Sequence, residues 1–348
     1  MGKGSIVNKP CHCGSGKKYK KCCKDKDEYM KKEKINAALR KELNIGSIKE
    51  CLFPDKTGCS EKVIKAHSIQ NNRILDVLSE NGEVIMLRPN ATEYNFKIQA
   101  EKIGRGRATT FTGFCRNHDK VIFQPIEDSD YKFNNIEQNA LFAYRAFVKE
   151  QHAKLSQYNI FSKYKNSYEK MAWGLIGAEA AIKDMEYHLD IFRKILFKKE
   201  YDLIETKIIV YDKICEFAVS SALNLSYDFE GNSVNNLDDL KKRAIPLFLT
   251  VLPSNGKTYV LLSYFKEDRK RFIFIDKQII GVDEGLQQIR LTNILMINCE
   301  NIVFSPRLWD RIDTEKQELY FSKLLKNLHE EESPGDIAED YGLNFFIN

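Results

Sequence analysis

Eight cysteine and histidine residues fall into two sets whose types and spacing suit a metal site. The first set is a Cys-x-Cys turn followed by a Cys-Cys pair, namely Cys11, Cys13, Cys22 and Cys23. The second set is a pair of cysteines followed by a Cys-x-x-His pair, namely Cys51, Cys59, Cys115 and His118. Thiolates and imidazoles are the ligands of structural Zn²⁺, and four of them complete its tetrahedral coordination. The sequence therefore predicts two structural zinc ions.

One histidine lies between the two halves of the second set. His67 follows the alternating residues 63–66, which predict a short strand ending near His67. A zinc-stabilised turn that presents one histidine suits proton transfer in phosphodiester chemistry. The alternative is a packed or capping histidine in a zinc-stabilised fold, and a single residue leaves both interpretations open.

The residues around the first set favour a compact metal knuckle. Gly14 and Gly16 let the backbone turn tightly, and five lysines of residues 17–24 offset the negative charge of four thiolates. This stretch closely resembles the SEC-C motif, the zinc knuckle that ends the SecA translocation ATPase. The four cysteines fall on its ligand positions, and residues 14–19 fall on its central signature; His12, inside the ligand turn, is not an expected ligand. The resemblance implies a docking tag for a partner protein, the ribosome or lipid.

The stretch from Cys51 to Asp119 resembles the HNH, or ββα-metal, nucleases, which are treble-clef zinc folds. In that family a knuckle precedes a strand ending in an Ala-His-Ile-type motif, and a second ligand pair opens the final helix. Residues 66–69 of this chain read Ala-His-Ser-Ile. The resemblance implies that the second set holds zinc and that His67 is the general base. It also implies that Asp119, directly after the second pair, binds a catalytic Mg²⁺ or Mn²⁺.

The chain departs from that family pattern at several positions. Seven residues separate Cys51 from Cys59 instead of two, and Asp119 stands where the family has histidine. The separation of His67 from Cys115 is also long. No clear counterpart of the family's central asparagine can be assigned, and Asn72 is the candidate. A non-enzymatic zinc adaptor that docks on protein, ribosome or nucleic acid is therefore the alternative function.

Positive charge is concentrated at the N-terminal end. Residues 1–50 hold 14 lysines and arginines against 6 acidic residues, whereas the whole chain carries a net charge of only +5. Such a segment suits nucleic acid, although a solvated lysine-rich tail is the commoner case. The residues predicted to contact phosphate are Lys17 and Lys18 of the knuckle and Arg105 and Arg107 of a glycine-flanked loop. Nucleic acid is the expected partner, and a protein bound by the knuckle is the other.

Length and composition bound the class of protein. A chain of 348 residues with 43% hydrophobic residues predicts two or three domains with real cores. Nine cysteines and no signal peptide indicate a reducing cytosol, so we expect a cytoplasmic protein, and we find no transmembrane run. A docking tag joined to a nuclease would fit a restriction or phage-defence protein, by analogy at the level of folds.

The predicted fold class is α+β, with two zinc elements, a helical middle and a C-terminal antiparallel sheet with helices. We expect a SEC-C-like zinc knuckle over 1–26, a helical linker over 27–50, an HNH-like or treble-clef zinc domain over 51–130, a helical region over 133–203 and an α+β domain over 204–348. In the last segment, strands are predicted over 217–225, 246–252, 258–265 and 272–275, with helices over 283–295 and 314–329. Short connections, including an Asn255-Gly256 turn, favour a meander.

Overall fold

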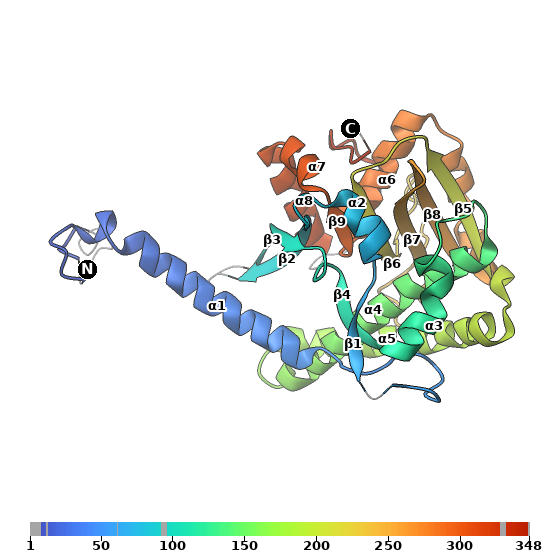
Figure 1. Cartoon of the computed structure of the whole chain (residues 1–348), viewed down its shortest axis with the longest axis horizontal. Coiled ribbons are helices and arrows are strands. Elements are labelled where there is room, and N and C mark those ends of the chain that lie inside the picture. Colours follow the sequence, from blue (N-terminus) through green and yellow to red (C-terminus); the bar gives the residue numbers. More distant parts are fainter. Residues whose placement is uncertain (1–7, 12, 61, 92–95, 328–331, 347–348) are drawn as a thin grey trace. The chain divides into compact units, whose positions relative to one another are not determined.

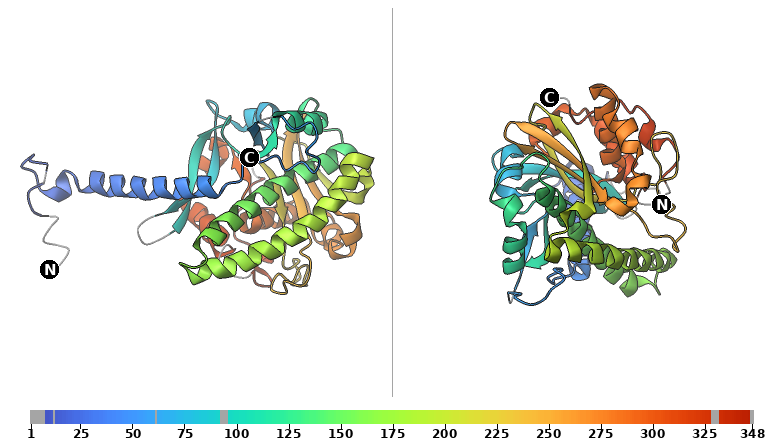
Figure 2. Two further views of the ribbon diagram at one scale, coloured as in Figure 1. Left: turned by 90° about the horizontal axis from the view of Figure 1, so that it is seen from below. Right: turned by 90° about the vertical axis from the view of Figure 1, so that its right-hand side faces the viewer.

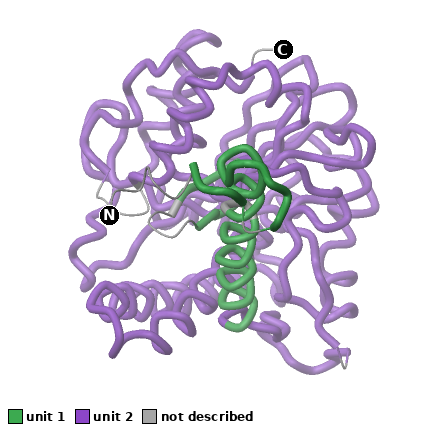
Figure 3. The backbone as a smooth tube through the Cα atoms, turned by 90° about the vertical axis from the view of Figure 1, so that its left-hand side faces the viewer, with its two compact units in different colours: residues 1–45, 88–99 green, residues 46–87, 100–348 purple. Residues whose placement is uncertain are grey.

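The computed structural model describes residues 8–11, 13–60, 62–91, 96–327 and 332–346. The chain divides into two compact units, residues 1–45 with 88–99 and residues 46–87 with 100–348 (Figure 3). Helices and strands are mixed along the chain and the larger sheet includes the C-terminal strands (Figure 1), which confirms the α+β prediction. The expectation for His12 and the predicted end of the last helix at 328–329 lie outside the described residues.

The structure contains α-helices, β-strands and short helical turns. The helices are α1 (Lys24–Gly46), α2 (Asp76–Leu78), α3 (Arg116–Glu127), α4 (Ile136–Tyr164), α5 (Glu169–Lys198), α6 (Glu284–Asn298), α7 (Pro306–Arg311) and α8 (Thr314–Asn327). The strands are β1 (Val63–His67), β2 (Glu83–Ala91), β3 (Phe96–Gly104), β4 (Thr110–Cys115), β5 (Ile204–Tyr211), β6 (Phe217–Leu223), β7 (Leu247–Ser254), β8 (Lys257–Phe265) and β9 (Ile302–Phe304). Short helical turns cover Tyr19–Lys21, Asn71–Leu75, Tyr201–Leu203, Lys266–Arg271, Ile275–Ile280 and Asp336–Ala338. Among the described residues, every helix is too short or too polar to traverse a bilayer.

The smaller unit is built on helix α1, which starts directly after Cys23. Asp25 and Asp27 lie in its first turn, where negative charge is favourable to the helix dipole. Its buried Asn36 forms a reciprocal pair with the backbone of Ala91: the side-chain oxygen accepts from the Ala91 N–H at 2.8 Å, and the side-chain nitrogen donates to the Ala91 carbonyl at 3.0 Å. One side chain thereby satisfies both backbone groups of a strand residue.

The larger sheet has the strand order β3-β2-β9-β6-β7-β8-β5, and β1 and β4 form a separate two-stranded sheet. The predicted meander is confirmed for β6, β7 and β8, which pair antiparallel in chain order. Asn255 and Gly256 both have positive φ values, 53° and 76°, as the tight turn between β7 and β8 requires. The order also places β5 beside β8 and β9 between β2 and β6, which makes the sheet more than a meander.

The strand predicted over 272–275 is wrong. These residues form a turn that runs into the helical segment Ile275–Ile280, and Phe272 and Ile275 are buried three residues apart, as one face of a helical turn requires. Strand β9 was absent from the prediction because its three residues are too few to show a period. It nevertheless joins Ile85↔Phe304 and Met86↔Val303, linking residues far apart in the sequence.

The core of the larger unit is organised around helix α4, which packs against β6, β7, β4 and the neighbouring helices α3 and α5 (Figures 1 and 2). Tyr144 of α4 lies in one hydrophobic cluster with Phe114 of β4 and Phe248 of β7. The other face of the sheet is covered as well, because Phe217 contacts Phe346 near the C-terminus. The boundaries predicted at residues 130 and 203 stay predictions, but the segments on either side of them share this cluster.

Candidate metal centres and the ββα element

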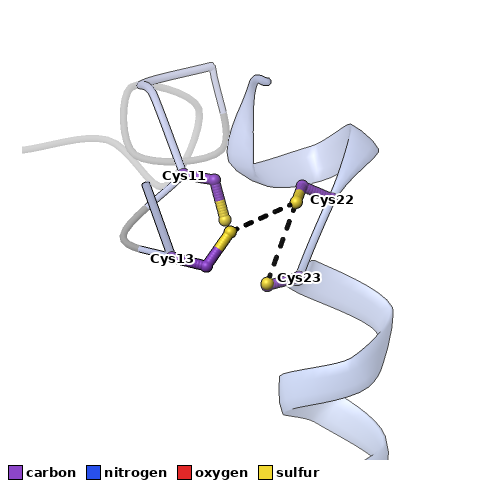
Figure 4. Close-up of side chains that lie close together, drawn as sticks. All are labelled: Cys11, Cys13, Cys22 and Cys23. Atoms are coloured by element: carbon purple, nitrogen blue, oxygen red, sulfur yellow. Dashed lines mark hydrogen bonds between the residues drawn. The ribbon is translucent and has the colours of Figure 1, made fainter. Parts of the chain in front are cut away.

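The first candidate centre is a cluster of four thiols at the start of the chain. The ligand atoms of Cys11, Cys13, Cys22 and Cys23 lie within 4.8 Å of one another (Figure 4). Cys13 and Cys22 are 3.5 Å apart at sulfur, and Cys22 and Cys23 are 3.9 Å apart. These separations bracket the edge of about 3.8 Å expected for a tetrahedron with Zn–S bonds of about 2.3 Å. The cluster could therefore hold a metal ion, and its dimensions fit Zn²⁺.

The backbone around the first cluster explains its shape. Gly14 and Gly16 have φ values of 79° and 70°, which glycine adopts without strain. The Cys11 N–H donates to the Lys17 carbonyl at 2.7 Å and closes the turn. The Ser15 hydroxyl lies 3.0 Å from the Cys22 sulfur. Hydrogen bonds with Ser15 also lower the pKa of the Cys13 thiol to about 6, which favours the thiolate that a metal needs.

The second candidate centre joins residues from opposite ends of the Cys51–Asp119 stretch. Cys51, Cys59, Cys115 and His118 bring their ligand atoms within 4.8 Å of one another. The Nδ1 atom of His118 lies 3.4, 3.4 and 3.5 Å from the sulfurs of Cys51, Cys59 and Cys115. An S–N edge of about 3.6 Å is expected around tetrahedral Zn²⁺. This equal spacing around one nitrogen fits a coordination sphere better than three separate hydrogen bonds.

The long loop between Cys51 and Cys59 positions the histidine ligand. The Nε2 atom of His118 lies 3.1 Å from the Thr57 carbonyl, so Nε2 carries the proton and leaves the lone pair of Nδ1 directed at the sulfurs. Asp55 holds this loop by accepting from the Thr57 N–H at 2.8 Å. The Asn117 amide donates to the Gly58 carbonyl at 2.8 Å from the helix side. The additional residues of the knuckle thus supply a partner that orients the candidate ligand His118.

Burial and hydrogen bonding affect the thiols of this centre in opposite directions. Burial opposes ionisation of Cys115, but the N–H of His118 and hydrogen bonds from Ser60 lower its pKa to about 6. Burial raises the pKa of Cys59 to about 11, with further contributions from Cys51 and Cys115. Several thiolates in one small volume repel one another, so a cation is needed to stabilise all of them together.

The second centre lies at the base of a ββα element. Strand β1 pairs antiparallel with β4, and β4 runs directly into α3 at Cys115. The Cys115 sulfur accepts from the His118 N–H at 3.5 Å and so caps the helix start. His67 is the last residue of β1 and pairs with Thr110. Its Nε2 atom lies 3.3 Å from the Arg105 carbonyl, and burial lowers its pKa.

The stretch between His67 and Cys115 is long because an inserted segment, residues 68–109, separates β1 from β4. The two ends of this inserted segment lie side by side. After His67 the chain forms α2, β2 and β3, and β2 joins the larger sheet. The Ser68 N–H then donates to the Thr109 carbonyl at 3.1 Å, and the Ser68 hydroxyl does so at 3.0 Å. The inserted segment therefore begins and ends at the same place in the ββα element. It changes the sequence spacing and leaves the local pairing of β1 and β4 intact.

Helix α3 places Asp119 on the stripe that faces α4. Asp119, Phe123 and Glu127 are four residues apart and so share one face of the helix. The guanidinium carbon of Arg145 lies 4.2 Å above the Phe123 ring, and its Nη2 atom is 2.6 Å from Glu127 Oε1. Burial raises the pKa of Asp119, while the positive charge of Arg145 opposes that shift. Glu127 and Arg145 also influence the pKa of His67 in opposite directions, which places this ion pair near both predicted catalytic residues.

The sequence prediction did not name Glu127 and Arg145, whose ion pair influences the pKa of His67 and of Asp119. Arg145 is 3% exposed at its side chain, and Nε has no partner among the described residues. A charged residue within the apolar stripe Leu141-Tyr144-Val148 of a predicted core helix was the available signal, because such residues are rarely buried without a specific partner. Across the described residues, no cluster of three or more histidine, cysteine or carboxylate ligands includes His67 or Asp119.

The residues predicted to contact phosphate have different environments. Arg105 is engaged, since its guanidinium donates to the Asn71 carbonyl at 3.1 Å and lies 3.3 Å from Asp76. Arg107, Lys17 and Lys18 are exposed. Asn72 is exposed on the short helix after β1 and accepts from the Asn71 amide.

Comparison with known proteins supports the first centre only. The SEC-C motif family matches residues 8–25, a range that contains all four thiols of the first cluster. No curated protein and no solved structure matches this chain. The resemblance of residues 51–119 to the HNH nucleases therefore rests on the ββα geometry and the second ligand set alone.

Proposed function

We propose that this protein is a zinc-stabilised, divalent-metal-dependent nuclease with its reaction centre between β1 and α3. The observation that carries this proposal is the position of His67 at the end of β1, in a ββα element whose helix starts at the Cys115–His118 ligand pair. In this arrangement the zinc is structural, since all four of its positions are taken by protein ligands.

His67 is the proposed general base. With Nε2–H donated to the Arg105 carbonyl, Nδ1 keeps the lone pair that accepts a proton. Its lowered pKa keeps the ring neutral near pH 7. A water oxygen would attack phosphorus as one of its protons passes to Nδ1, and the bond from phosphorus to the leaving sugar oxygen would break, with that oxygen taking up a proton from solvent. The products are a phosphomonoester and a free hydroxyl.

Asp119 is the proposed protein ligand for Mg²⁺ or Mn²⁺, which when bound stabilises negative charge on the phosphate. Because Glu127 is already paired with Arg145, Asp119 is the carboxylate of the α3 stripe without that ion pair. Waters and the phosphate itself would complete the coordination, as is usual for Mg²⁺. Arg145 neutralises Glu127 and limits the repulsion between the two acidic residues of the stripe.

A zinc adaptor is the second candidate function, and the SEC-C match at residues 8–25 favours it. The exposed Lys17 and Lys18 would then contact nucleic acid, the ribosome or an acidic protein surface. In that case His67 would serve only to close the turn through Arg105. The cytoplasmic location and the restriction or phage-defence role stay predictions under either function.

The test compares His67→Ala and Asp119→Asn with the unaltered chain on single- and double-stranded DNA and RNA, each with Mg²⁺ or Mn²⁺. Loss of a general base lowers a rate by about 10²–10⁴-fold. Both variants should retain two zinc ions per chain. The matched control is Val121→Ala, an exposed residue on the same helix, which should cleave normally. Absence of cleavage by the unaltered chain on every substrate would reject the nuclease and leave the adaptor.

A further inference from the structure

The turn between helices α4 and α5 and the adjoining helix ends carry exposed aromatic side chains and exposed lysines within a short stretch of sequence. Trp173 is 68% exposed and Tyr168 is 62% exposed, although aromatic side chains of this size are usually at least half buried. Lys163, Lys165 and Lys170 are exposed in the same short stretch, which contains a single acidic residue between 163 and 173. We call Lys163, Lys165, Tyr168, Lys170 and Trp173 the hairpin tip.

Two glycines near Trp173, at positions 174 and 177, help to explain why its indole ring is exposed. A Cβ atom on Gly174 would come within 3.0 Å of the Phe161 ring, so glycine lets α5 approach α4 closely at this point. Trp173, one residue earlier, lies about a quarter turn around α5 from this contact and is exposed. On that side the next helical turn carries Gly177, where a Cβ would meet nothing within 4 Å. Glycine at position 177 therefore places no side chain over the indole.

The positive charge of the lysines indicates which kind of partner fits this surface. A second copy of the chain would bring the lysines of two tips together, which like charges disfavour. A polyanion with flat apolar groups satisfies both the lysines and the indole. Nucleic acid has this chemistry, and only unpaired bases expose their faces to a protein side chain. In a duplex those faces are stacked on one another.

We propose that the hairpin tip binds single-stranded nucleic acid by stacking an unpaired base on Trp173 while the lysines contact the phosphates. This proposal extends the proposed function by naming a binding surface for its substrate. It also stands if His67 hydrolyses nothing, since binding at the tip needs no reaction.

The chain provides its own spectroscopic probe for the test. It has two tryptophans, and Trp309 is only 6% exposed. In a full-length Trp309→Phe variant loaded with zinc, all indole emission therefore comes from Trp173. We would titrate it with a thymidine 15-mer and with the corresponding duplex, in buffer without Mg²⁺ or Mn²⁺, and follow both Trp173 emission and anisotropy of a labelled oligonucleotide. The single strand should quench Trp173, and the duplex should quench it much less.

Variants separate stacking from charge. Trp173→Ala should weaken single-strand binding by about 5–150-fold, while Trp173→Phe retains part of the affinity. Replacing the three lysines by glutamine should make the negative slope of log affinity against log salt less steep by about 2, at about 0.7 per phosphate contact. The matched control is Phe133→Ala, which removes another exposed aromatic ring and should change nothing.

Several outcomes would overturn the proposal. If anisotropy reports binding while Trp173 emission stays constant, the oligonucleotide is bound elsewhere, for example at the knuckle. Equal quenching by the duplex would exclude a single-strand site. A change of sedimentation with Trp173→Ala, without a change of affinity, would make the tip a protein interface. Because binding is measured without divalent metal, none of these results depends on cleavage at His67.

Discussion

The Nη2 atom of Arg145 lies 2.6 Å from Oε1 of Glu127, which joins the middle of α4 to the end of α3. The two partners differ in exposure: the side chain of Arg145 is 3% exposed and that of Glu127 is 37% exposed. The pair holds the helix that carries Asp119 and His118 against the helix at the centre of the core. Substitution of Glu127 and substitution of Arg145 should therefore destabilise the protein by different amounts.

We predict that Glu127→Gln destabilises the protein more than Arg145→Met. Removing the carboxylate leaves a buried guanidinium without its partner, whereas removing the guanidinium leaves a carboxylate that water can reach. Methionine also keeps much of the packing on Phe123. We expect losses of roughly 3 kcal/mol for Glu127→Gln and roughly 2 kcal/mol for Arg145→Met. Urea unfolding of the zinc-loaded protein measures both.

The double variant tests whether the two effects share one cause. Because the residues are in contact, its loss should be smaller than the sum of the single losses by roughly 1–3 kcal/mol. Glu137→Gln serves as a control for removing a carboxylate of α4 that contacts Tyr201 instead. Additive losses would mean that the ion pair does not couple α3 to α4.

We predict two zinc ions per chain, and a different consequence for the loss of each. Cys22→Ser with Cys23→Ser should lower the zinc content from two to one and leave the unfolding of the larger unit unchanged. Cys51 and Cys115 belong to the hydrophobic cluster of that unit, so Cys51→Ser with Cys115→Ser should lower both zinc content and unfolding temperature. Elemental analysis and calorimetry measure the two quantities. One zinc in the unaltered chain would remove the structural basis of the ββα proposal.

The ligands could be predicted from sequence because their chemistry depends on residue type and local order. Cys115-x-x-His118 is a short local pattern that is expected to begin a helix and does so at α3, and residues 63–67 alternate clearly enough to indicate a strand. The pairing of β2 with β9 could not be predicted, since it joins Ile85 to Phe304 through three residues without a visible period. Arg145 was missed for a related reason: periodicity identifies a buried face but not the partner that makes a buried charge acceptable there.

Asn36 offers a local test of the smaller unit. Asn36→Ala removes both hydrogen bonds to the backbone of Ala91, and an unpaired buried group costs about 1–3 kcal/mol. We therefore expect faster hydrogen exchange at the Ala91 amide. Lys34→Ala, an exposed residue of the same helix, is the control and should leave that amide protected. Unchanged protection in Asn36→Ala would mean that Asn36 does not hold Ala91 in solution.

Two buried histidines should make the larger unit sensitive to acid. Burial lowers the pKa of His152 to about 4, with a further decrease from Lys149, and its Nε2 atom lies 3.1 Å from the Ile48 carbonyl. Burial lowers the pKa of His188 to about 3, and its Nε2 atom faces Arg243, which is itself paired with Asp268. Both rings are neutral in the folded protein near pH 7.

The sign of the effect follows from these directions. An unfolded histidine takes up a proton near pH 6.5, whereas these two do so only at much lower pH when folded. The unfolded state therefore binds more protons as the pH falls below 6.5. Stability present above that pH is lost as the pH falls to about 4 for His152 and about 3 for His188, by an amount on the order of 3–5 kcal/mol for each histidine.

His152→Gln and His188→Gln should each flatten the dependence of unfolding free energy on pH between 7.5 and 5.5, a range chosen to limit release of zinc from its thiolates. Glutamine keeps a donor for the Ile48 carbonyl in the first variant and an acceptor for Arg243 in the second. Zinc content measured at each pH separates metal loss from histidine protonation. Parallel curves for both variants and the unaltered chain, at constant zinc content, would show that other groups determine the acid sensitivity.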